Sequence, residues 1–243
     1  MNLLESLFIL TILSIFVLST TSKDENTFKG LIGDQGEKWY KGDKGDKCDI
    51  GPVGPAGPKS GGAVYTRWGR KSCPAGAELV YEGLAAGGHY THMGGGADHV
   101  CLPAKEPQNM KKPVPPRYSL IYGTEYENVN DIFPGKNNHN VPCAVCYAPN
   151  RSTKLMIPSR TSCPSLWTME YKGYLMTSLS SHDNHNKNSL HECVDDNPES
   201  IDGSDANTDG ALFYFILLRC IGTGIPCPPY AENEFVTCVV CTR

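Results

Sequence analysis

The chain of 243 residues has no long hydrophobic run. Its longest apolar stretch, residues 7–18, has twelve residues, which is short of the roughly 20 that a membrane-spanning helix needs. Small and polar residues follow it, before the charged residues that begin at Lys23, an order typical of a secretory signal peptide. We therefore predict a signal peptide over residues 1–22 and no membrane insertion of the mature chain. Because Glu5 is the only charged residue before the apolar stretch, a signal anchor is the alternative.

The chain also lacks an excess of charge of either sign, with 22 Lys and Arg residues against 26 Asp and Glu residues. A basic surface that binds nucleic acid is therefore not expected. The sequence contains no G-x-S-x-G nucleophile motif, no H-E-x-x-H zinc motif, no phosphate-binding loop and no dinucleotide-binding motif. We expect no enzyme activity, no cofactor and no bound metal.

Glycine is abundant, and near the N-terminus it keeps a register of three. From Gly30 to Gly57, eight of the ten register positions hold glycine, and Trp39 and Cys48 occupy the other two. Three polyproline-II chains wind together only where the residue at the crowded axis lacks a side chain. We therefore predict a short, interrupted collagen-like Gly-X-Y segment over residues 30–60, preceded by a short N-terminal segment over residues 23–29.

This segment has little of what stiffens a triple helix. Its three prolines occupy X positions, and no proline occupies a Y position, where hydroxyproline is common in collagen. The triple helix is therefore expected to be weak alone. A disordered linker rich in Gly, Pro, Lys and Asp is the alternative. Lysines 38, 44, 47 and 59 occupy Y positions, where they could cross-link chains.

The rest of the chain contains a tandem repeat. Each copy has a Cys-Pro dipeptide, a Tyr-x-Gly tripeptide, a lone cysteine and a closing C-x-x-C. We place repeat 1 at residues 61–150 and repeat 2 at residues 151–243. The repeated cysteines are Cys73, Cys101, Cys143 and Cys146 in repeat 1 and Cys163, Cys193, Cys238 and Cys241 in repeat 2. With Cys220 and Cys227 they make an even number, as complete disulfide pairing in a secreted domain requires, although four cysteines in each repeat allow three connectivities. A zinc site or a redox role for the C-x-x-C motifs is the alternative.

The repeats have the composition of short β-strands. Strands are expected in the runs AVYTRW, ELVYEG, SLIYG, TMEYKG, ALFYFILL and ENEFVTCVVC, with loops rich in Gly, Asn and Pro between them. No amphipathic helix longer than ten residues is apparent. The expected fold is a mainly β, disulfide-rich C-terminal domain of two tandem repeats.

The runs WGRKSCP, CLP, PCAVC, YKGYLM and CVVC after a collagen-like stretch resemble the sponge-type short-chain collagens related to spongin. More distantly, they resemble the duplicated C-terminal non-collagenous domain of type IV collagen. The resemblance covers nearly all of residues 30–243. It implies the disulfides Cys73–Cys146, Cys101–Cys143, Cys163–Cys241, Cys193–Cys238 and Cys220–Cys227. Cys48 is then left over and could link chains within a trimer.

This resemblance implies a secreted structural protein of the extracellular matrix. Such a protein would form a homotrimer through its C-terminal domain and could join a higher matrix assembly. Repeat 1 lacks an equivalent of the local pair Cys220 and Cys227, and the collagen-like part is much shorter than in type IV chains. The competing hypothesis is a soluble, collagen-stalked recognition protein with a lectin-like or defensive role.

Three further motifs were weighed as sites. Asn150-Arg151-Ser152 is a glycosylation sequon between the repeats, and an ordinary turn is its alternative. Residues 205–210 copy the first half of a calcium-binding loop, but Ile216 occupies the twelfth position, where such a loop needs an acidic residue. We therefore expect an ordinary Asn/Asp-rich loop there. Six histidines occupy equivalent loops of the two repeats, where we expect them to be solvated rather than bound to metal. They are His89, His92, His99, His182, His185 and His191.

Overall fold

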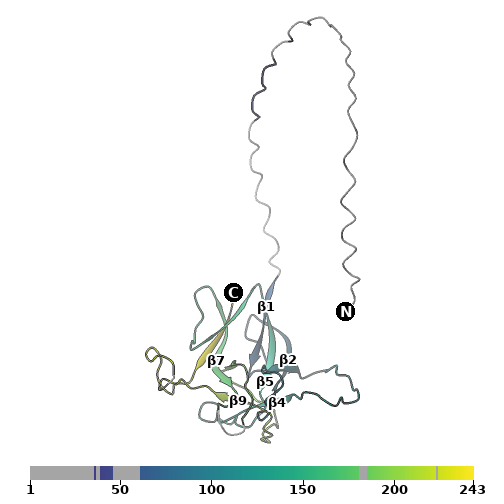
Figure 1. Cartoon of the computed structure of the whole chain (residues 1–243), viewed down its shortest axis with the longest axis vertical. Coiled ribbons are helices and arrows are strands. Elements are labelled where there is room, and N and C mark those ends of the chain that lie inside the picture. The colour runs from purple at the N-terminus through teal and green to yellow at the C-terminus, as the bar shows by residue number, and fades with distance from the viewer. Residues whose placement is uncertain (1–35, 37–38, 46–60, 181–184, 223) are drawn as a thin grey trace, which may run out of the picture. The chain divides into compact units, whose positions relative to one another are not determined.

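A computed structural model describes residue 36 and residues 39–45, 61–180, 185–222 and 224–243 (Figure 1). The chain divides into two units, Met1–Gly54 and Pro55–Arg243. In the first unit, the described residues are exposed and belong to no helix or strand. The predicted signal peptide, most of the collagen-like segment and Cys48 lie outside the described residues.

The second unit consists of ten β-strands and their loops. Repeat 1 contributes β1 (Gly62–Trp68), β2 (Glu78–Gly87), β3 (Val100–Pro103), β4 (Tyr122–Tyr126) and β5 (Pro142–Pro149). Repeat 2 contributes β6 (Lys154–Pro158), β7 (Thr168–Thr177), β8 (Glu192–Asp195), β9 (Ala211–Phe215) and β10 (Thr237–Thr242). The described residues contain no helix, so no helix among them could cross a membrane. The predicted mainly β, disulfide-rich fold is confirmed.

The two repeats have the same internal pairing. In repeat 1, β5 lies between β1 and β2, and β2 also pairs with β3 and β4. In repeat 2, β10 lies between β6 and β7, and β7 also pairs with β8 and β9. All of these pairs are antiparallel, as short connections favour. Each strand of repeat 1 therefore has an equivalent five strands later.

Two parallel pairings join the repeats. Trp68 of β1 pairs with Val194 of β8, and β4 pairs with β9 over three residues. Because β7 also pairs with β9, the order β7-β8-β1-β5-β2-β4-β9 closes into a ring of seven strands, and β6 and β10 extend the sheet beyond β7. Parallel pairing needs long connections, and here it occurs between strands of different repeats.

The buried core belongs to both repeats together. One cluster combines Trp68, Tyr126 and Phe133 of repeat 1 with Val194 and Phe213 of repeat 2. A second cluster likewise mixes residues of both, with Tyr65 next to Tyr171. Since neither repeat encloses either cluster alone, the two repeats form one folding unit.

Three of the expected strands extend beyond the observed ones, and the observed strands β3, β5, β6 and β8 lie outside all of the expected runs. ENEFVTCVVC was expected as a strand from residue 232, but β10 begins at Thr237. SLIYG was expected as a strand, but residues 119–121 are outside any strand and β4 begins at Tyr122. ALFYFILL was expected to continue to residue 218, but β9 ends at Phe215. Residues 119–121 have no strand partner among the described residues, whereas Leu217 forms an isolated antiparallel bridge with Phe235.

Candidate functional site

Five disulfides join the cysteines of the two repeats. The pairs are Cys73–Cys146, Cys101–Cys143, Cys163–Cys241, Cys193–Cys238 and Cys220–Cys227. These are the five pairs that the family resemblance implied. Their Cα–Cα distances lie between 5.7 and 5.9 Å, within the usual range for a disulfide.

The C-x-x-C motifs lie in β5 and β10, the central strands of the repeats. Residues three apart in a strand point to opposite faces, so the two cysteines of each motif bond to different partners. Cys143 bonds to Cys101 of β3, and Cys146 bonds to Cys73 in the loop after β1. The motif thus fixes one segment on each face of the central strand, and its cysteines do not pair with each other.

The Tyr-x-Gly motif positions the strand that carries the lone cysteine. The hydroxyl of Tyr81 donates to the backbone carbonyl of Cys101 at 3.1 Å, and the hydroxyl of Tyr171 donates to that of Cys193 at 2.9 Å. The glycine two residues later allows close approach, because a Cβ on Gly83 or Gly173 would lie within 2.2 Å or 1.7 Å of a backbone oxygen of the neighbouring strand. One motif therefore sets both the position and the spacing of β3 and of β8.

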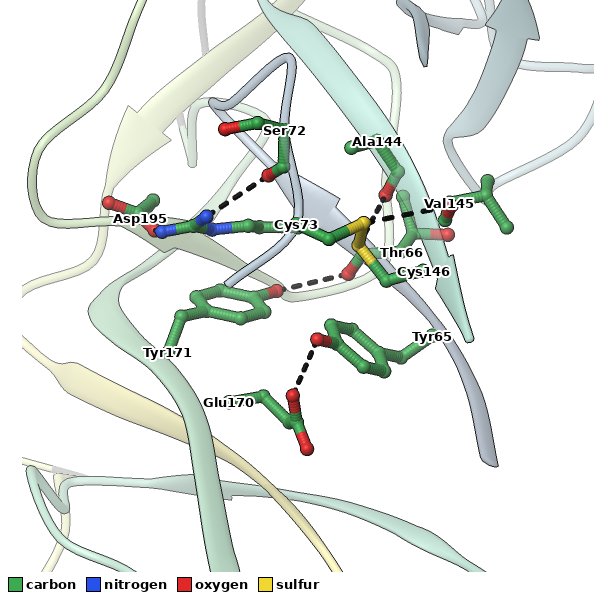
Figure 2. Close-up of a disulfide and its surroundings, with 11 residues drawn as sticks. Tyr65, Thr66, Ser72, Cys73, Ala144, Val145, Cys146, Glu170, Tyr171 and Asp195 are labelled. Carbon is green, nitrogen blue, oxygen red and sulfur yellow. Dashed lines mark hydrogen bonds and ion pairs between the residues drawn. A yellow bond between two sulfur atoms is a disulfide. The ribbon is translucent and has the colours of Figure 1, made fainter. Parts of the chain in front are cut away.

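A β-bulge at the same position of each repeat has two different environments. Val80 interrupts the pairing of β2 with β5, and Glu170 interrupts that of β7 with β10. Val80 is exposed, whereas Glu170 is buried and accepts hydrogen bonds from the hydroxyls of Tyr65 at 2.6 Å and Thr242 at 2.5 Å. Figure 2 shows Tyr65 of repeat 1 pointing at Glu170 of repeat 2. Burial and the adjacent carboxylate raise the pKa of Tyr65, so it remains a donor.

A second set of polar contacts also joins β1 of repeat 1 to β7 and β8 of repeat 2, along a boundary that we call the seam. Arg67 forms an ion pair with Asp195 at 2.7 Å, and both side chains are largely buried. The hydroxyl of Tyr171 also lies 3.1 Å from the carbonyl oxygen of Thr66 (Figure 2). The indole nitrogen of Trp68 donates to Glu192 at 2.8 Å. Buried polar groups with partners on the other repeat fix the register of β1 against β7 and β8.

Among the described residues, the contact that covers a strand segment of repeat 2 has no equivalent on repeat 1. In repeat 2, the strand segment 211–213 is covered by β4 of repeat 1, and Leu212 is 4% exposed and Phe213 0% exposed. The ladder register makes residues 119–121 the equivalent segment of repeat 1, because Gly123 pairs with β2 as Phe215 pairs with β7. There Leu120 is 54% exposed and Ile121 is 52% exposed. We call residues 119–121 the open segment.

A hairpin of repeat 1 packs on repeat 2, and the equivalent hairpin of repeat 2 is exposed. Repeat 1 continues from β4 through residues 127–140, and this hairpin packs on repeat 2 through Tyr126, Phe133 and the bond from Ile201 N to Asn140 O at 3.1 Å. Residues 216–236 form the equivalent hairpin of repeat 2, which contains Cys220–Cys227. Five of its apolar side chains are exposed, namely Leu217, Ile221, Ile225, Tyr230 and Phe235. We call residues 216–236 the open hairpin. The sequence contains these apolar residues, but only the structure, with the two repeats compared, shows that they are exposed in repeat 2.

The remaining predicted sites have different locations. Asn150 is exposed, with a positive φ, in the turn between β5 and β6. His89, His92 and His185 lie near one another around Tyr90, while His182 lies outside the described residues. The expectation that all six histidines are solvated is wrong for His99, which is buried between Trp68 and Phe213. Burial lowers the pKa of His99 to about 4.

No family model matches the chain.

Proposed function

We propose that this protein is a secreted structural component of the extracellular matrix, a short-chain collagen whose C-terminal domain assembles three chains. The single observation that carries this proposal is the contact of repeat 1 with repeat 2, which forms once within the chain. The equivalent surfaces, the open segment of repeat 1 and the open hairpin of repeat 2, are exposed. Five disulfides favour an oxidising destination. The Gly-X-Y register of residues 30–60 supports three as the number of chains.

The contact runs in one direction, from repeat 1 to repeat 2. Repeat 1 donates the end of β1 and the strand β4, and repeat 2 receives them at β8 and β9. Such a heterologous contact leaves a free donor on repeat 2 and a free acceptor on repeat 1, so copies add head to tail and a suitable rotation closes them into a ring. Three chains would bring together six repeats with one kind of contact.

The expected contact between chains can be written residue by residue. Because Glu125 pairs with Leu212, the equivalent Leu217 of the open hairpin would pair with Leu120 of the open segment in the next chain. Because Trp68 pairs with Val194, the equivalent Pro158 at the end of β6 would lie against Leu102 of β3. Val194 is fully buried, whereas Leu102 is 39% exposed and lines an apolar cleft with Leu84 and Pro107. Covering these apolar residues would stabilise the assembly at roughly 25 cal/mol per Å² of apolar surface.

Native mass is the direct test, measured by sedimentation of the full secreted chain. The wild-type protein is expected to sediment as three chains, and Leu120→Asp as one, because a charge at the centre of the contact would be buried without a partner. Leu166→Asp is the matched control, since Leu166 is an exposed leucine in the turn before β7 and belongs to neither the open segment nor the open hairpin. A wild-type protein that sediments as single chains would overturn the proposal, and trimers of Leu120→Asp would overturn this contact.

A cross-link tests the register separately. Leu217→Cys combined with Leu120→Cys should give disulfide-linked trimers, because paired strand residues have Cα atoms within the reach of a disulfide. With Cys48→Ser in every variant, so that this cysteine cannot link chains, each single variant should give no trimeric ladder on a non-reducing gel. Extraction tests the matrix role: a matrix component should need reductant or protease for release. A freely soluble trimer that elutes from immobilised glycans would instead favour the collagen-stalked recognition protein.

A further inference from the structure

Three carboxylates from the two repeats meet where β4 runs beside β9. Glu125 and Glu127 lie two residues apart along β4 and its extension, so their side chains leave the same face. Asp209 lies two residues before β9. One carboxylate oxygen of each residue lies within 4.8 Å of the other two. The bond from Glu127 N to Phe213 O, at 3.0 Å, holds the two chain segments together.

This cluster has no positive partner. Glu125 is buried and accepts hydrogen bonds from the backbone nitrogens of Thr208 and Asp209, at 3.2 and 3.3 Å. Glu127 is 9% exposed, and its Oε1 is buried with no hydrogen-bond partner among the described residues. None of the ion pairs found in the described part of the chain includes any of the three carboxylates. Like charges this close, with one buried oxygen unpaired, destabilise the fold unless a cation or a proton joins them.

The third carboxylate belongs to the loop whose sequence copies half of a calcium site. Within residues 205–210, Asp209 meets the two glutamates, whereas Asp205 and Asn207 are exposed. The sequence argued against calcium because Ile216 occupies the twelfth position of the loop. In the fold, the missing carboxylates come from the other repeat. Their distance along the chain, more than eighty residues, explains why a loop pattern cannot show them.

We propose that Glu125, Glu127 and Asp209 bind one calcium ion, which joins the two repeats beside the ring closure. Two oxygens bound to one calcium ion at about 2.3–2.6 Å are at most roughly 5 Å apart, and the 4.8 Å limit on these three carboxylate oxygens lies within that spacing. Carboxylate oxygens are hard ligands that calcium prefers, and extracellular calcium modules bind at roughly 10⁻⁴ to 10⁻³ M. Burial and the neighbouring carboxylates raise the pKa of Glu127 to about 7.

The test compares the melting temperature of the full secreted chain in chelator and in ~10 mM calcium. Wild-type protein should melt about 3 to 10 °C higher with calcium, from the affinity range above and the usual relation between ligand binding and Tm. In Glu127→Gln and Asp209→Asn the calcium shift should disappear. In chelator, Glu127→Gln should melt at or above the wild-type temperature, because the substitution removes repulsion. A variant that had lost only packing would instead melt lower under both conditions.

The exposed Asp205 of the same loop provides the matched control. Asp205→Asn should keep the full calcium shift if Glu125, Glu127 and Asp209 form the site. A shift that Asp205→Asn abolishes and Glu127→Gln keeps would overturn the assignment in favour of a loop site. An equal shift with magnesium would overturn calcium as the ligand. Wild-type stability that rises on acidification but ignores calcium would show a shared proton and overturn the proposal.

Discussion

The two repeats have the same strands, bridges and motifs, and they differ in what covers them. Segment 211–213 of repeat 2 lies under β4, whereas the open segment of repeat 1 is bare. β8 has neighbours on both sides, β7 and β1, whereas β3 pairs with β2 alone. The repeated motifs thus specify each repeat's internal fold, while the contact between the repeats decides which copy has its strand segments covered. Four comparisons of equivalent residues test this difference, in order of expected effect.

The bridges of the lone cysteines give the largest effect. Cys101–Cys143 and Cys193–Cys238 close loops of 42 and 45 residues, so replacing either pair by alanine should lower the free energy of unfolding by about 4 kcal/mol. Denaturant titration measures this. Locally the outcomes should differ, because β8 keeps two strand neighbours. Amide exchange should accelerate strongly in β3 of the first variant and weakly in β8 of the second, and equal acceleration would contradict the comparison.

The glycines of the Tyr-x-Gly motifs come next. Gly173→Ala should destabilise the protein by about 3 kcal/mol and Gly83→Ala by about 1 to 2 kcal/mol, because both place a Cβ against a backbone oxygen. The edge strand β3 can move away, whereas β8 is held by β1. Thermal or denaturant unfolding of the two single variants gives the ranking. The exposed Gly76 provides a control position with nothing near its Cβ, although its φ of 91° also disfavours alanine.

Acidification distinguishes the equivalent histidines His99 and His191. The pKa of His99 is about 4 when folded, below its usual 6.5, because burial lowers it; Asp98 opposes this shift and Lys187 adds to it. The unfolded chain therefore binds the proton more readily, and the contribution of His99 to stability, present above pH ~6.5, falls as the pH drops toward 4. The loss amounts to about 2 kcal/mol between pH ~7.5 and ~5.

Variants isolate this contribution from that of Glu127, which has the opposite sign. The pKa of Glu127 is raised, so its contribution is present at low pH and is lost as the pH rises through about 7. His99→Phe should therefore gain stability relative to the wild type on acidification, measured by denaturant titration in chelator at both pH values. His191 is exposed, and His191→Phe at this equivalent position is the matched control for the substitution itself. Parallel pH curves for wild type and His99→Phe would refute the assignment.

The hydroxyls of the motif tyrosines should give the smallest effect. Tyr171→Phe is expected to cost about 1.5 kcal/mol and Tyr81→Phe about 0.5 to 1 kcal/mol. The Tyr171 hydroxyl contacts carbonyls of both repeats and is buried, whereas the Tyr81 hydroxyl contacts only Cys101 of its own repeat. Differential scanning calorimetry on the pair provides the measurement. A larger loss of stability for Tyr81→Phe would show that the hydroxyl contact between the repeats stabilises the fold less than the contact within one repeat.

The sequence predicts the parts of the fold that the repeated motifs determine. The duplication was evident from the cysteines and from Tyr-x-Gly, and alternating runs indicated β1, β2 and β7 correctly. What it could not predict depends on contacts between distant residues. His99 occupies a polar loop sequence but is buried by Trp68 and Phe213. Similarly, the apolar residues of the open segment were expected in a strand, because apolar composition does not reveal whether a neighbouring strand covers them.

Three points of the chain meet at one end of the C-terminal unit, where Gly61 O accepts from Asn150 N and Arg243 O accepts from Ser152 N (Figure 1). Tension applied through the preceding segment would therefore load β1, which is paired with β5 over seven residues from Gly62 to Trp68. If β1 peeled away, the covalent link at Cys73 would stop the extension after about a dozen residues, roughly 40 Å of slack. Because β1 also pairs with β8 and contributes Tyr65 and Trp68 to the buried clusters, its loss would open the ring, and the Cys73–Cys146 bridge would set the limit of the extension.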